Sequence, residues 1–177
     1  MNDSPYRIIG DNEFVITRVF DAPRELVWKM WTDPQHLARW WGPRKLTTRV
    51  EKLEPRVGGA YKFVMELPDG TQYPMKGVYR EVVEPERLVY SVDTSEHPPE
   101  WREAILKNLP PGAPQEIGGG SHTVTFEKEG AKTRMTVRCT FASTELRNAF
   151  TRMGMSDGWS QSLDKLAEQV EKGGAKA

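Results

Sequence analysis

Apolar and polar residues alternate with a period of two over most of the chain after Pro43, which predicts antiparallel strands. Pro68-Asp69-Gly70 and Glu84-Pro85-Glu86 fall between neighbouring runs as turns, and residues 129–132 join the last two runs as a hairpin. The predicted strands cover residues 14–20, 46–52, 60–67, 72–83, 87–93, 121–128 and 133–141.

Two short helices are predicted between the first and second strands. Asp21 is the expected cap of the first helix, over residues 23–31, because a carboxylate there can accept from free backbone N–H groups. Asp33-Pro34 stops this helix and starts the next, and Gly42-Pro43 ends the second. The first helix presents one apolar face, made of Leu26, Val27, Met30 and Trp31.

The chain closes with a predicted long helix that Ser143 or Thr144 can cap. Its apolar stripe runs from Leu146 to Val170. Gly154 and Gly158 interrupt the stripe, so we expect a bend there or a close approach of the helix backbone to the sheet or a ligand. The termini, residues 1–11 and 173–177, are expected to form an N-terminal arm and a disordered tail around a domain of residues 12–172.

Residues 94–120 are too long for a simple turn between strands. Within them Trp101, Ile105 and Leu109 recur every four residues and predict a helix over residues 100–109, which Pro110-Pro111-Gly112 stops. We interpret this insertion as a lid over a cavity, with the glycine run 118–120 as its hinge. A surface helix packed permanently on the sheet edge is the open alternative.

Four of the six tryptophans lie within fourteen residues, at positions 28, 31, 40 and 41. Tryptophan buries more surface than any other residue, so the cluster indicates either a dense corner of the core or the wall of an apolar pocket. Both interpretations stay open at this stage.

Composition excludes several classes of function. Lys plus Arg and Asp plus Glu both number 25, so the chain has no net positive charge to attract nucleic acid. No apolar run approaches the roughly 20 residues that span a bilayer, and the N-terminus lacks the order of a signal peptide. We therefore expect a single domain in the cytoplasm.

Candidate catalytic chemistry is sparse. The single cysteine excludes an internal disulfide and a cysteine-based zinc site. His36, His97 and His122 are far apart with no metal-ligand spacing, so we expect neither metal nor cofactor. A pair of Cys139 and His122 is conceivable because both fall on inward strand faces, but a small apolar filler beside a strand-end histidine is favoured.

The order of elements, one strand, two short helices, six strands and a long helix, predicts an α+β fold. In this fold a curved antiparallel sheet grips the C-terminal helix over an internal cavity. Several motifs occur in order along residues 12–172: Ala22-Pro23-x-x-x-Val27-Trp28-x-x-Trp31-Thr32-Asp33-Pro34, Trp40-Trp41-Gly42-Pro43, Gly58-Gly59-x-Tyr61, Pro85-x-Arg87-Leu88 and Gly158-Trp159-x-x-x-Leu163. Together they closely resemble the START-like superfamily, also called SRPBCC or birch-pollen-allergen superfamily, in the branch similar to the C-terminal domain of the heat-shock-protein-90 ATPase activator.

The resemblance implies a helix-grip fold whose members bind hydrophobic molecules, and some of which catalyse cyclisation. We therefore expect a small hydrophobic molecule as the partner. A polyketide cyclase-like enzyme and a chaperone-associated module are the alternatives, and a homodimer is left open. As an enzyme, the chain would use His122 as its acid–base group. The predicted ligand-binding residues are Trp31, Trp40, Tyr61, Phe63, Met65, Met75, Tyr79, Tyr90, Trp101, His122, Phe126, Cys139, Met153 and Trp159.

Overall fold

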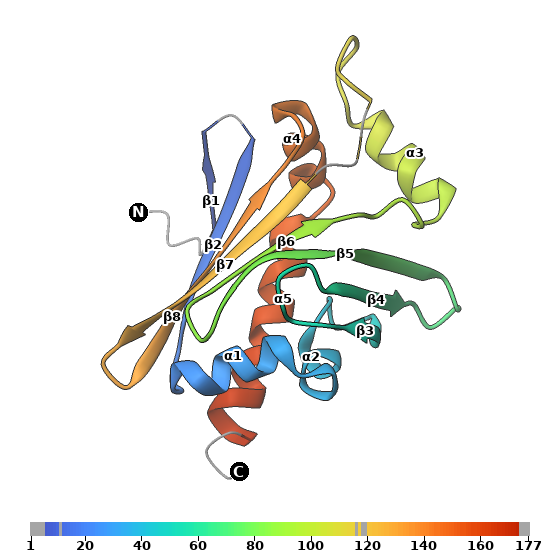
Figure 1. Cartoon of the computed structure of the whole chain (residues 1–177). Coiled ribbons are helices and arrows are strands. Elements are labelled where there is room, and N and C mark those ends of the chain that lie inside the picture. Colours follow the sequence, from blue (N-terminus) through green and yellow to red (C-terminus); the bar gives the residue numbers. More distant parts are fainter. Residues whose placement is uncertain (1–5, 11, 116, 118–119, 174–177) are drawn as a thin grey trace.

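One antiparallel sheet curves around the C-terminal part of the chain in this computed structural model, which describes residues 6–10, 12–115, 117 and 120–173 (Figure 1). Its eight strands lie in the order β1-β2-β8-β7-β6-β5-β4-β3. Their bounds are β1 (Tyr6–Ile9), β2 (Glu13–Phe20), β3 (Thr47–Leu53), β4 (Ala60–Glu66), β5 (Gln72–Val83), β6 (Arg87–Val92), β7 (Gly120–Glu129) and β8 (Lys132–Thr140).

The helices cover one side of this sheet. A pair of short helices, α1 and α2, lies at one end of the sheet, and α5 runs beside them (Figure 1). The bounds are α1 (Arg24–Thr32), α2 (Pro34–Trp40), α3 (Pro99–Lys107), α4 (Thr144–Arg152), α5 (Met155–Glu168) and a final π-helical turn, η1 (Gln169–Gly173). The predicted α+β helix-grip fold is confirmed.

The structure adds detail at the two ends of the chain and corrects the expected cap of α1. The N-terminal arm contains a strand, because Tyr6–Ile9 pairs with β2 at the edge of the sheet. Asp21 does not cap α1: Pro23 occupies the cap position, without a side-chain hydrogen bond. In the tail, Gly173 belongs to η1, and residues 174–177 lie outside the described residues.

The predicted C-terminal helix is broken into two pieces. Ser143 caps α4 by accepting from the Leu146 N–H at 3.1 Å. Gly154 stands between α4 and α5 with φ +94°, a backbone conformation that only glycine adopts without strain. Gly158 stays inside α5, where an added Cβ would lie 3.6 Å from Pro43 Cγ. The bend is therefore at Gly154, and Gly158 marks the close approach of α5 to the loop after α2.

None of the helices in the described ranges combines the length and the apolar character that crossing a bilayer requires.

The two aspartates near α1 and α2 provide a matched test of this local geometry. The Asp33 carboxylate accepts from the N–H groups of Gln35 and His36, at 2.9 Å and 3.3 Å, whereas the Asp21 side chain caps neither helix. We expect Asp33→Ala to lower the free energy of unfolding by about 0.5–2 kcal/mol. Asp21→Ala should change it by no more than about 0.5 kcal/mol. Urea denaturation of both variants checks this, and equal losses would contradict the assignment of the cap.

Candidate ligand-binding cavity

The tryptophan cluster forms a packed corner of the core. Trp31 and Trp40 are 3% and 0% exposed, and their ring centroids lie 4.8 Å apart. Both indole N–H groups are satisfied: Trp31 donates to the Met135 sulfur at 3.2 Å and Trp40 to the Met30 carbonyl at 2.9 Å. The core interpretation therefore holds for these two residues.

Aromatic side chains on the inward faces of the strands continue this corner. Tyr61 lies at its centre, with ring centroids 4.9 Å from Phe63, 5.8 Å from Tyr79 and 5.3 Å from Tyr90. The space left between Trp31 and these four rings is only about 10 Å³. That is about one water-sized probe, so this part of the concave face is filled by protein.

The other part of the concave face is hollow. A cavity of about 970 Å³ lies between the sheet, α3, α4 and α5. Arg44 and Lys45, which follow α2, and Gln161 of α5 also line it, and the Arg44 backbone N–H donates to the Gln161 side chain at 2.9 Å. Apolar and aromatic side chains form most of the wall: Trp41, Leu46, Met65, Leu67, Tyr73, Met75, Val92, Trp101, Ile105, Ile117, Phe141, Leu146, Phe150, Met153, Met155 and Trp159.

The structure divides the fourteen predicted residues into two equal groups. Seven line the cavity: Met65, Met75, Trp101, His122, Cys139, Met153 and Trp159. Seven do not line it and lie in the packed core instead: Trp31, Trp40, Tyr61, Phe63, Tyr79, Tyr90 and Phe126. An inward strand or helix face contacts other side chains at one end of the sheet and the cavity at the other, so these seven residues lie in the core and not on the cavity wall.

Sequence reasoning missed several residues of the wall. Trp41 is not among the predicted ligand-binding residues. It connects the tryptophan corner to the cavity, and its ring lies 5.5 Å from that of Trp159. Tyr73 lies two residues before Met75 on the same strand, so strand parity could have found it. His97 and Phe150 belong to no strand pattern. His97 follows the end of β6, and no periodicity in the sequence pointed to it.

His122 and Cys139 face each other on β7 and β8, as expected from their inward positions. The His122 ring nitrogen Nδ1 lies 2.9 Å from the Tyr90 hydroxyl. Burial lowers the pKa of His122 to about 3. Burial also raises the pKa of the Cys139 thiol well above its usual range, against a smaller opposite effect of a hydrogen bond from Trp159. Both groups are neutral near pH 7, so they do not form a thiolate–imidazolium pair.

His97 enters the cavity wall from the connection between β6 and α3. Its ring lies 5.4 Å from Tyr73 and 4.3 Å from Trp101, in edge-on geometry. Neither ring nitrogen has a hydrogen-bond partner in the described part of the chain. Burial lowers the pKa of His97 to about 4; the nearby Pro74 carbonyl opposes this shift without making a hydrogen bond of good geometry.

Helix α3 closes one side of the cavity. Trp101 and Ile105 belong to the predicted stripe and line the cavity, while Leu109 lies beyond the end of the helix. A small hydrophobic cluster built around Ile105, Leu146 and Ala149 packs α3 against α4, apart from the main core. In the predicted hinge, residues 118 and 119 lie outside the described residues, and Gly120 starts β7.

Comparison with known protein families finds one match that spans most of the chain. Residues 21–171 match the model of the activator of Hsp90 ATPase homolog 1-like protein family. No curated protein matches this chain.

Solved structures share the fold over almost the whole chain. A protein from Arthrobacter aurescens is 26% identical, with a TM-score of 0.74 over 94% of this chain and 93% of its own. A protein from Chromobacterium violaceum is 27% identical, with a TM-score of 0.70 over 90% and 97%. A protein from Rhodobacter sphaeroides, with a TM-score of 0.77 over 94% and 96%, is 18% identical and supports the fold alone.

The buried histidine predicts how stability depends on pH. The pKa of His122 is about 3 in the folded chain and 6.5 when unperturbed, so between these values the unfolded chain binds more protons. Stability therefore falls as the pH drops below about 6.5, and the contribution of His122 approaches about 1.4 kcal/mol per pH unit. Lowered carboxyl pKa values, as at Glu54 and Glu96, act mainly below this window.

Replacing His122→Gln should roughly halve this pH dependence, because His97, whose pKa is lowered to about 4, titrates in the same range. Urea denaturation at steps from pH 7 to pH 5 measures it, with the wild-type chain as the reference. A variant whose free energy of unfolding falls as steeply as that of the wild type would show that His122 is not the group responsible.

Proposed function

We propose that this chain, which belongs to the activator of Hsp90 ATPase homolog 1-like family of the START-like superfamily, binds one small, largely apolar molecule in the cavity beneath α3. The observation that carries the proposal is the cavity itself. Its volume of about 970 Å³ lies at the upper end of the range found for small-molecule sites. Protein interiors are otherwise close-packed, as the tryptophan corner of this chain is.

The composition of the wall supports an apolar ligand. Four methionines, Met65, Met75, Met153 and Met155, line the cavity together with aromatic rings. Methionine is flexible and polarizable, so it adapts to ligands of different outline and contacts aromatic rings favourably. Burying apolar surface contributes about 25 cal/mol per Å² before the costs of binding are subtracted, which supports affinities in the low-micromolar range.

Catalysis has less support in the site. As an acid–base group His122 would be a weak base, because burial holds its pKa at about 3. No group of three or more metal-ligating side chains occurs among the residues that the structure describes. A ligand-binding role thus accounts for the wall better than a polyketide cyclase-like reaction does.

A chaperone contact also has less support. Such a contact needs a continuous exposed apolar or charged patch outside the cavity. Among the described residues, the large exposed apolar side chains come from different elements, namely β1, β2, β5, a loop and the helix break: Ile8, Val19, Val57, Val78, Val83 and Met153. A cytoplasmic location and a homodimer stay predictions of the sequence.

Two variants at one position test the cavity as the binding site. We expect the neutral fluorescent probe N-phenyl-1-naphthylamine to bind the wild-type chain with a low-micromolar dissociation constant. Cys139→Phe places a ring at the cavity wall and should weaken binding at least 10-fold. Cys139→Ala leaves the space open and should bind within about 3-fold of wild type. Thermal melting confirms that both variants are folded.

The proposal is dropped if this probe and a panel of fatty acids, sterols and aromatic compounds change neither tryptophan fluorescence nor the melting temperature. Unchanged affinity in a folded Cys139→Phe variant would place the probe elsewhere on the chain.

We further propose that α3 acts as a lid. It is held to α4 by a small cluster separate from the main core, and such satellite clusters open more easily than a core does. Amide hydrogen exchange over residues 99–107, with and without N-phenyl-1-naphthylamine, tests this. A lid gains protection when the probe binds, whereas equally strong protection in both states would mean that the helix is fixed scaffold.

A further inference from the structure

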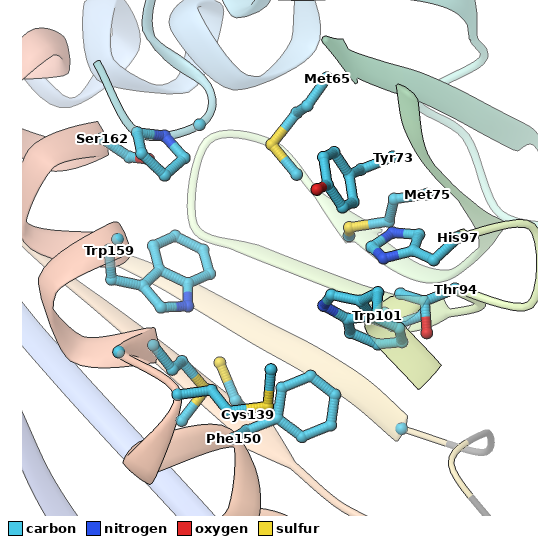
Figure 2. A pocket seen from close by; sticks show the side chains of 18 of the residues that line it. Met65, Tyr73, Met75, Thr94, His97, Trp101, Cys139, Phe150, Trp159 and Ser162 are labelled. Atoms are coloured by element: carbon cyan, nitrogen blue, oxygen red, sulfur yellow. The ribbon is translucent and has the colours of Figure 1, made fainter. Parts of the chain in front are cut away.

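Hydrogen-bonding groups without partners gather at one end of the cavity. The ring nitrogens of His97 are buried and unpaired within the described ranges. The Tyr73 hydroxyl and the Trp101 indole N–H also line the cavity and make no hydrogen bond to the described residues. Figure 2 shows the three side chains on the same side of the cavity, with the Tyr73 hydroxyl and the Trp101 nitrogen turned toward the open space.

The other histidine of the cavity wall already has a hydrogen-bond partner. The His122 ring nitrogen Nδ1 shares a hydrogen bond of 2.9 Å with the Tyr90 hydroxyl. Figure 2 places Trp159 and Cys139 across the open space from Tyr73 and His97. The two histidines of the wall therefore differ: a ring nitrogen of His122 already has a partner, whereas neither ring nitrogen of His97 has one among the described residues.

Hydrogen bonds and ion pairs of its neighbours hold the segment that carries His97 in place. The Asp93 carboxylate accepts from the Ser95 N–H at 2.8 Å, and the His97 N–H donates to the Thr94 carbonyl at 3.0 Å. Glu96, directly before His97, forms ion pairs with Lys62 at 3.4 Å and Lys76 at 2.9 Å. The His97 ring is thus preorganised between Tyr73 and Trp101, which is how a binding site lowers the cost of ordering.

We infer that the ligand is an aromatic molecule with a neutral carbonyl group, whose oxygen binds between Tyr73, His97 and Trp101. This inference rests on the proposed function, because it names the class of ligand for that cavity. The three side chains match an acceptor: the indole N–H only donates, the phenol donates, and a neutral imidazole has one N–H. Their ring faces and edges suit an aromatic frame.

The charges around this end favour a neutral oxygen over a carboxylate. Lys62 and Lys76 are already paired with Glu96. Arg44 is at the α5 side of the cavity, where it pairs with Glu168. A carboxylate buried at the His97 end would lack a free cationic partner, which is costly in an apolar site. Burial also keeps His97 neutral near pH 7, since its pKa is lowered to about 4.

Three naphthalene probes of nearly equal size test the inference. 2-Acetylnaphthalene carries the carbonyl, 2-ethylnaphthalene lacks it, and 2-naphthoate replaces it with a carboxylate. Titrations followed by tryptophan fluorescence at pH 7 give the three dissociation constants. We expect 2-acetylnaphthalene to bind about 10-fold more tightly than 2-ethylnaphthalene, as one to two neutral hydrogen bonds allow, and 2-naphthoate to bind more weakly than 2-acetylnaphthalene.

Variants that remove polar atoms of Tyr73 and His97 test whether these residues cause the preference for 2-acetylnaphthalene over 2-ethylnaphthalene. In Tyr73→Phe/His97→Phe the preference for 2-acetylnaphthalene should fall below about 2-fold, while 2-ethylnaphthalene binds as to wild type. The single variant Tyr73→Phe should reduce the preference partly and serves if the double variant does not fold. Tyr79→Phe removes a hydroxyl from the packed core and should leave the preference unchanged.

The possible results separate this inference from the proposed function. Equal binding of the acetyl and ethyl probes to the wild-type chain, or a preference that survives in the folded variants, overturns the inference and leaves cavity binding intact. If 2-naphthoate binds more tightly than 2-acetylnaphthalene, the ligand group at this end is not a neutral carbonyl, and the inference is overturned on that point. If none of the three probes binds while N-phenyl-1-naphthylamine does, the inference fails alone; if N-phenyl-1-naphthylamine and the wider panel also fail to bind, the proposed function fails with it.

Discussion

The packing of tryptophans between α1, α2 and the sheet is the constraint on which the rest of the structure depends. Trp31 and Trp40 fill one end of the concave face and are anchored there by hydrogen bonds to Met135 and Met30. Trp41 ends the corner by stacking edge-on against Trp159 of α5. Because the filling stops there, the remaining concave face stays hollow between β4, β5, α3 and α5. The same cluster thus both stabilises the fold and sets the boundary of the cavity.

Within the cavity wall, hydrogen bonding distinguishes His97 from the other histidine. Among the described residues, Arg24 Nε and His36 Nδ1 are also buried without a partner, but these residues do not line the cavity, and the Trp40 indole is paired. In the cavity wall, His122 has a partner in Tyr90. His97 does not, although its backbone is firmly held. Unpaired buried polar atoms are uncommon in native proteins and often mark functional sites. The position of these atoms in the cavity wall makes the His97 end the part of this structure that most needs a ligand.

The sequence predicted the fold well because local patterns determine it. Period-two alternation located the strands from β2 to β8 within one or two residues, and Asp33-Pro34 placed the boundary between α1 and α2. The site was predicted only in part, since alternation distinguishes inward from outward residues but not core from cavity. Tyr61 and Met65 share one inward face of β4, yet only Met65 reaches the cavity. His97 depends on a connection between β6 and α3 that has no periodicity.

The six indole N–H signals of the tryptophans offer the most direct test of this account. In a two-dimensional nitrogen–proton NMR spectrum, with signals assigned by single Trp→Phe variants, 2-acetylnaphthalene is added to saturation. The account predicts that the signals of Trp101 and Trp159 shift, because both residues line the cavity, while those of Trp31 and Trp40 stay in place. Stationary Trp101 and Trp159 signals, or shifts confined to Trp31 and Trp40, would contradict it.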